Sequence, residues 1–131
     1  MTETTKSGPG ISPLAPDHFP DMPAIPGVTL ATKATGSRYQ GRTDFLFAAF
    51  APGTVAAGVL TRSKTASAPI DWCRRSLLHG KAQGLVVNAG NANAFTGKAG
   101  DATTNAVAQT AMAALACTGQ EIYLASTGVI G

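Results

Sequence analysis

The stretch that decides the fold is Ile122-Tyr-Leu-Ala-Ser-Thr-Gly-Val-Ile-Gly131. Its first residues are apolar and partly β-favouring, which predicts a buried strand over residues 122–125. Ser126-Thr127-Gly128 then forms a turn of small residues that a substrate can approach closely. Two backbone N–H groups there, or one N–H and the Thr127 hydroxyl, would suit the charge that develops on a carbonyl oxygen during acyl transfer. The same residues also fit a plain strand-ending turn.

Composition indicates one globular domain. Of 131 residues, 44% are hydrophobic and 13% charged, and six of the eight prolines fall within the first 26 residues. We expect residues 1–10 to be a disordered tail and residues 11–131 to belong to one α/β domain, with residues 11–26 extended along its body. The net charge of +3 is scattered, which argues against a nucleic-acid partner. No run approaches the roughly 18 apolar residues of a membrane span, so we expect a soluble, cytoplasmic protein.

The two cysteines, Cys73 and Cys117, each fall within a predicted helix, far from any second cysteine. This spacing predicts neither a disulfide framework nor a metal site, and it fits a reducing compartment. A nucleophile and base pair of Cys73 and His79 is disfavoured, because six residues at about 100° each place them about 240° apart around a helix.

The remaining pattern predicts an α/β chain. Strands are expected over residues 28–34, 44–50, 54–61 and 85–87, and helices over residues 69–79 and 101–117. Pro52-Gly53 predicts a hairpin between the second and third strands. Pro69 in the first turn and Gly80 after the last predict the ends of the first helix, and Gly119 is expected to end the second.

The loop from Asn88 to Gly97 contains three asparagines, Asn88, Asn91 and Asn93, among small residues. They can satisfy turn backbone or bind polar substrate groups. A phosphate-binding loop is excluded, because alanine stands where that motif needs glycine and again where it needs Ser or Thr. If the strand, helix and strand from residue 85 to 125 form a parallel crossover, this loop and Thr127-Gly128 meet at one sheet edge, where ligands commonly bind.

Several stretches together resemble the ornithine acetyltransferase family of arginine biosynthesis. They are Ile11-Ser-Pro-Leu-Ala-Pro16, Met22-Pro-Ala-Ile-Pro-Gly27, Ser67-Ala-Pro69 with Trp72-Cys-Arg74, Asn88 to Gly97, and Ser126 to Gly131. The resemblance implies a layered α/β fold and a precursor that cuts itself before a threonine, whose α-amino group and hydroxyl act as base and nucleophile. Acetyl then passes from N-acetylornithine to that threonine and on to glutamate.

The resemblance also implies an oxyanion-hole role for Thr127 and Gly128, and a substrate-region loop at Asn88, Asn91 and Asn93. No cofactor or metal is implied, although acetyl-CoA is a further substrate in bifunctional members. The expected partner is the chain's own downstream β-chain, in an α2β2 or larger assembly. The family's Pro-Asn-Met-Ala-Thr junction is absent from the 131 residues, so we expect an N-terminal fragment that is inactive alone. The alternative is a non-catalytic module, either structural or binding a small polar ligand.

Overall fold

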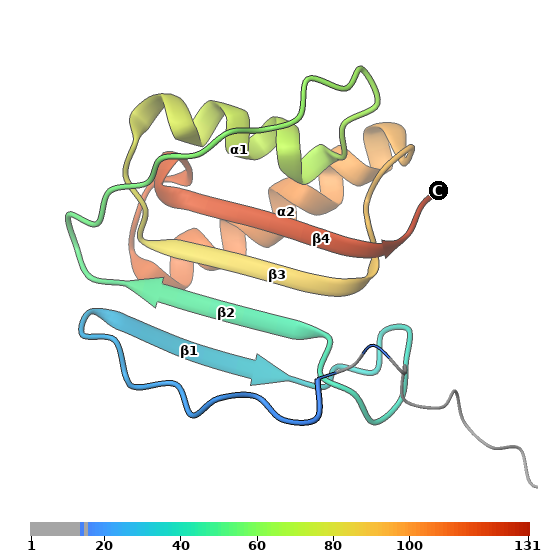
Figure 1. Cartoon of the computed structure of the whole chain (residues 1–131). Coiled ribbons are helices and arrows are strands. Elements are labelled where there is room, and N and C mark those ends of the chain that lie inside the picture. The colour runs from blue at the N-terminus through green and yellow to red at the C-terminus, as the bar shows by residue number, and fades with distance from the viewer. Residues whose placement is uncertain (1–13, 15) are drawn as a thin grey trace, which may run out of the picture.

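The computed structural model describes residue 14 and residues 16–131. Within this part of the chain, four strands form one sheet in the order β1-β2-β3-β4. The elements are β1 (Val28–Lys33), β2 (Phe45–Phe50), α1 (Ala68–His79), β3 (Gly84–Asn91), α2 (Gly97–Leu115), the short 3-10 helix η1 (Gly119–Glu121) and β4 (Ile122–Val129). The β1–β2 and β2–β3 pairs are antiparallel, and β3–β4 is parallel. Both helices pack against the half of the sheet formed by β3 and β4 (Figure 1).

The first two predicted strands and the first helix are confirmed, within one or two residues at their ends. Proline lies in the first turn of α1, and Gly80 follows its last turn with a φ of 71°. This left-handed conformation lets the Gly80 N–H bond the Ser76 carbonyl, which is why glycine ends the helix there.

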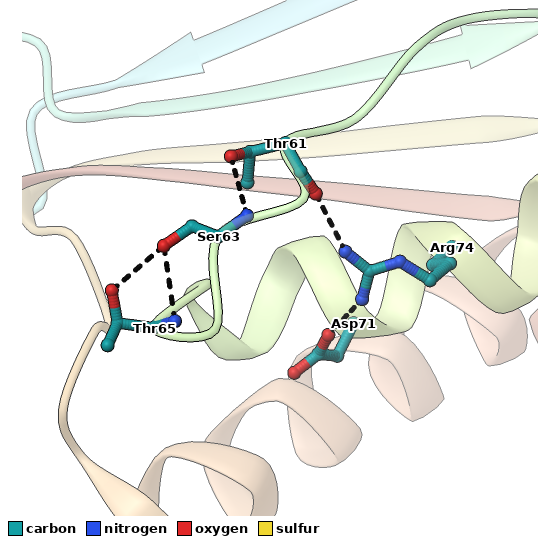
Figure 2. Close-up of polar contacts among 5 residues, drawn as sticks. All are labelled: Thr61, Ser63, Thr65, Asp71 and Arg74. Atoms are coloured by element: carbon teal, nitrogen blue, oxygen red, sulfur yellow. Dashed lines mark hydrogen bonds and ion pairs between the residues drawn. The ribbon is translucent and has the colours of Figure 1, made fainter.

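The predicted strand over residues 54–61 is wrong, because both edges of β2 are occupied by β1 and β3. The segment instead makes an isolated bridge, Val55 with Lys81, and then runs on as coil. Figure 2 shows how its end is held: Arg74 of α1 donates to the Thr61 carbonyl at 3.0 Å and forms an ion pair with Asp71. Ser63 bonds the Thr61 hydroxyl through its N–H and Thr65 through its own hydroxyl.

Two further boundaries differ from those predicted. The second helix begins at Gly97 and ends at Leu115, and Ala116, not Gly119, takes the left-handed conformation that stops it. The short strand at residues 85–87 continues to Asn91, and the strand at 122–125 continues to Val129. Ser126-Thr127-Gly128 therefore lies inside β4, where Gly128 has a positive φ of 128° and stays paired with Gly90, and the predicted strand-ending turn is wrong.

The core lies between α2 and the sheet. Its buried members are Val86, Ala108, Ala111, Ile122 and Leu124. The helix contributes only alanines here, so its backbone can approach the sheet closely. The larger partly buried side chains, Phe45, Phe47, Trp72 and Met112 among them, pack around this centre.

The predicted disordered tail at residues 1–10 lies outside the described residues. Of the proline-rich segment that follows, Phe19, Met22 and Ile25 are exposed, so these apolar side chains are not buried against the domain as expected. Among the described residues, no helix combines the length and the apolar character needed to cross a membrane.

Candidate active site at the end of β4

The β3–α2–β4 unit is a parallel crossover, which was the condition under which the two loops were expected to be neighbours. Ser126 pairs with Asn88, Thr127 with Ala89 and Gly128 with Gly90. The asparagine-rich stretch and Thr127-Gly128 are therefore direct neighbours at the carboxyl end of two parallel strands. Ligands commonly bind at this end of an α/β sheet.

The hydrogen bonds at Leu124 and Val129 show which main-chain groups of β4 point toward β3 and which point away from it. Leu124 directs its N–H and C=O away from β3, to the Cys73 sulfur, whereas the Val129 carbonyl accepts from Ala92, on the β3 side. In a strand these directions alternate from residue to residue. Thr127 therefore directs its main-chain groups into the ladder with β3. The Gly128 N–H belongs to the same trans peptide as the Thr127 carbonyl and points the opposite way, toward the open edge of the sheet.

The side chains alternate as well, so neighbouring residues of β4 face opposite sides of the sheet. Ser126 faces the α2 side and donates to Asn88 Oδ1 at 2.5 Å. Thr127 faces the other side, where it is exposed. The Thr127 hydroxyl and the Gly128 N–H are thus two donors, one residue apart, that are both accessible at the open end of β4.

A cavity of about 470 Å³ lies on the α2 side, between the sheet and the first turns of α2. Its lining includes Asn88, Asn91, Asn93 and Ser126, and it does not include Thr127 or Gly128. The three asparagines thus line the cavity on the α2 side of the sheet, whereas Thr127 and Gly128 lie outside it, although the backbones of the two groups are adjacent.

The three asparagines already make bonds within the chain. The Asn93 amide donates to the Gly100 carbonyl at 3.1 Å and the Thr104 hydroxyl at 2.9 Å, and its oxygen accepts from Thr96 at 2.6 Å. Asn91 accepts from the Asn93 N–H, and Asn88 donates to the Asn91 carbonyl. Asn93 therefore fixes the start of α2, which is local structural chemistry.

Asp44 is a buried residue of the same cavity that the sequence did not single out. Its carboxylate accepts from the Thr35 N–H at 2.6 Å and the Thr35 hydroxyl at 2.8 Å, and also from Ser37. The Thr35 N–H is the main cause that lowers the pKa of Asp44, ahead of the opposing effect of burial. Because the carboxylate is bonded on both oxygens, it holds the loop between β1 and β2.

Helix α1 covers the first half of the outer edge of β4. Cys73 donates to the Leu124 carbonyl at 3.1 Å and accepts from the Leu124 N–H at 3.3 Å. Trp72 and Ser76 both donate to the Ile122 carbonyl, at 2.9 and 3.0 Å. Burial raises the pKa of the Cys73 thiol, so this cysteine is a structural cap and is poorly suited to nucleophilic attack.

The described part of the chain contains no group of three or more His, Cys, Asp or Glu side chains placed to hold a metal ion. The chemistry available at the end of β4 is hydrogen-bond donation to an oxygen.

Solved structures with this fold define the class. The crystal structure of ornithine acetyltransferase complexed with ornithine from Mycobacterium tuberculosis matches with a TM-score of 0.77 and 36% identity, over 82% of this chain and 59% of that one. The arginine biosynthesis bifunctional protein ArgJ from Bacillus halodurans matches with a TM-score of 0.76 and 29% identity, over 81% of this chain and 56% of that one. The fold is the mixed α/β fold of the ornithine acetyltransferases.

The ArgJ family model matches residues 29–131, and the chain belongs to the ArgJ family. It is 58% identical over 121 residues to the arginine biosynthesis bifunctional protein ArgJ of Bradyrhizobium diazoefficiens, and 58% identical over 125 residues to that of Nitrobacter winogradskyi. These matches cover 92% of this chain, and 29% and 30% of the relatives. The chain thus spans less than a third of their length.

Proposed function

We propose that this chain is the part of an ornithine acetyltransferase that carries the oxyanion donors. The proposed reaction moves an acetyl group from N-acetylornithine to a threonine of the enzyme and then to glutamate. Two facts support it: membership of the ArgJ family, and similarity to a solved ornithine acetyltransferase described as complexed with ornithine.

The observation that carries the proposal is the placement of two donors at the open end of β4. When a nucleophile attacks the acetyl carbonyl, its oxygen becomes negative, and preorganised donors stabilise that charge. The Gly128 N–H points out of the ladder, and the Thr127 hydroxyl is exposed beside it. A backbone donor and a side-chain donor of this kind can bind one oxygen together.

The nucleophile comes from outside these 131 residues in this proposal. It is a threonine released by self-cleavage of a precursor, and its α-amino group takes the proton of its hydroxyl. The hydroxyl oxygen bonds the acetyl carbon, the ornithine amine leaves with a proton, and the glutamate amine then takes the acetyl group and regenerates the threonine. The downstream β-chain would carry that threonine, in an α2β2 or larger assembly.

No cofactor is required by this chemistry, since acyl transfer needs only a nucleophile, a base and oxyanion donors. A second activity with acetyl-CoA as the acetyl donor is consistent with the word bifunctional in the relatives' names. In that case the acetyl-threonine would form from the thioester and be passed to glutamate.

The cavity on the α2 side favours a second candidate, a module that binds a small polar ligand without catalysis. Its volume of about 470 Å³ lies within the range of small-molecule sites. The bonds that its asparagines already make within the chain leave fewer groups for a ligand, so acetyl transfer is the better-supported function.

The test is Thr127→Ala in the complete open reading frame that carries this chain. Loss of one oxyanion donor should lower the rate of acetyl transfer from N-acetylornithine to glutamate about 10²- to 10³-fold, with substrate binding nearly unchanged. Self-cleavage should slow too, because it also passes through a tetrahedral oxyanion. Thr127→Ser keeps the hydroxyl and should retain most of the rate.

Thr29→Ala is the matched control, since Thr29 is an exposed threonine in the edge strand β1. It should mature and turn over normally. Normal maturation and turnover by Thr127→Ala would show that its hydroxyl is not a donor and would remove the main support for the proposal.

A further inference from the structure

Gly90 and Gly128 face each other across the β3–β4 pair, and both have positive φ angles, of 132° and 128°. Only glycine adopts this backbone region readily. A Cβ added at Gly128 would lie 2.5 Å from the Gly90 carbonyl oxygen and 2.8 Å from the Asn91 nitrogen. The backbone of Gly128 therefore rests against the peptide that joins Gly90 to Asn91.

Gly90 is confined from its other side as well. It is buried, and a Cβ added there would lie 3.1 Å from the Cβ of Arg38. An alanine at position 90 must leave its φ of 132°, and the Arg38 contact restricts the direction in which it can move. The peptide between Gly90 and Asn91 would rotate, and Gly128 would shift with it.

We infer that Gly90 is a positioning residue, which places the Gly128 N–H for the oxyanion through the close contact of the two glycines. The inference rests on the proposed function, because it requires Gly128 to be an oxyanion donor. Gly90 itself touches neither substrate nor nucleophile in this role. A displacement of the donor by about 1 Å is enough to cost about 10²-fold in rate.

One measurement uses the unaltered 131-residue chain. Amide hydrogen exchange followed by NMR should show the Gly128 N–H exchanging much faster than those of Thr127 and Val129, because only the Gly128 N–H points out of the ladder. Protection of Gly128 equal to that of its two neighbours would overturn the inference without any variant.

The kinetic test is Gly90→Ala in the complete open reading frame, assayed for acetyl transfer. We expect kcat to fall about 10- to 100-fold with KM within about twofold of its normal value. Adding Arg38→Gly removes the 3.1 Å contact and should restore part of kcat. The control is Gly53→Ala, which meets the same kind of backbone strain at a φ of 85° but has no neighbouring atom within 4 Å.

The outcomes separate this inference from the proposed function. If Thr127→Ala slows transfer and Gly90→Ala behaves like Gly53→Ala, Gly90 has no positioning role and the proposed function stands. A higher KM at unchanged kcat would also overturn the inference. Normal transfer by Thr127→Ala would overturn the proposed function, and the inference with it. If Gly90→Ala does not fold, Gly90→Ala combined with Arg38→Gly is compared with Arg38→Gly alone, and equal kcat values for the two would overturn the inference.

Discussion

Replacing Cys73 by alanine tests whether α1 protects the edge of β4. The Cys73 sulfur is the hydrogen-bond partner of both main-chain groups of Leu124, which is 5% exposed. Cys73→Ala leaves one N–H and one C=O in a buried site without these bonds. Each unsatisfied buried group costs about 1–3 kcal/mol, and sulfur bonds belong at the low end. We therefore expect a loss of about 2–4 kcal/mol in the free energy of unfolding.

Ser76→Ala should cost less, about 1 kcal/mol, because the Ile122 carbonyl keeps its bond from Trp72 at 2.9 Å. Cys73→Ser retains a donor and an acceptor and should also lose about 1 kcal/mol. Cys117→Ala removes the other cysteine, which is only partly buried, and is the matched control.

Urea unfolding of the 131-residue chain measures all four variants. The chain has one tryptophan, and Trp72 bonds the protected edge directly, so its fluorescence reports this region. The denaturant slope should stay constant while the midpoint falls. If Cys73→Ala and Cys117→Ala differ by less than about 0.5 kcal/mol, the sulfur bonds to Leu124 do not stabilise the edge.

Four further results are expected. Tyr123→Phe should leave stability unchanged or raise it by about 1 kcal/mol in urea unfolding, because the Tyr123 hydroxyl is buried with no partner in the described chain. Asn93→Ala should cost about 2 kcal/mol by the same measurement, since its amide joins three groups at the start of α2. The pKa of Glu121 is lowered from 4.5 to about 2, first by the hydrogen bond from the Gln83 side chain and then by the bonds from Thr118. The stabilising contribution of Glu121 should therefore be complete above pH 4.5 and lost as the pH falls toward 2. Glu121→Gln should flatten that part of the plot of unfolding free energy against pH. The 131-residue chain alone should show no acetyl transfer between N-acetylornithine and glutamate, and turnover would place the nucleophile within it.

The sequence was enough to predict those elements whose first and last residues are determined by the conformational limits of single amino acids. Pro69 and Gly80 fix the ends of α1 through constraints on one residue each, so the sequence predicts the helix correctly. The crossover from β3 through α2 to β4 was also predictable, because a buried strand, a helix and a second strand in that order favour parallel pairing.

The errors concern contacts between distant residues. Residues 54–61 have the composition of a strand, yet the edge of β2 that they would need is taken by β3. The extension of β4 through Gly128 depends on Gly90, 38 positions earlier in the chain, because two facing glycines allow a close approach that one glycine cannot provide. The only sign of this close approach in the sequence is that one glycine stands two residues after Asn88 and another stands two residues after Ser126.

The part of β4 that α1 covers matters both for the stability of that strand and for the chemistry proposed at its end. An exposed strand edge carries free N–H and C=O groups and invites unwanted pairing, so proteins usually cover such edges. Side chains of α1 bond the outward main-chain groups at Ile122 and Leu124, and the next outward groups belong to Ser126 and Gly128. A side chain that bonded Gly128 as Cys73 bonds Leu124 would occupy the Gly128 N–H, which the proposed oxyanion needs. The residues of β4 that α1 covers therefore precede the proposed donors. The first half of the strand is held by α1, and the second half is left uncovered in the described chain, as the proposed acetyl transfer requires.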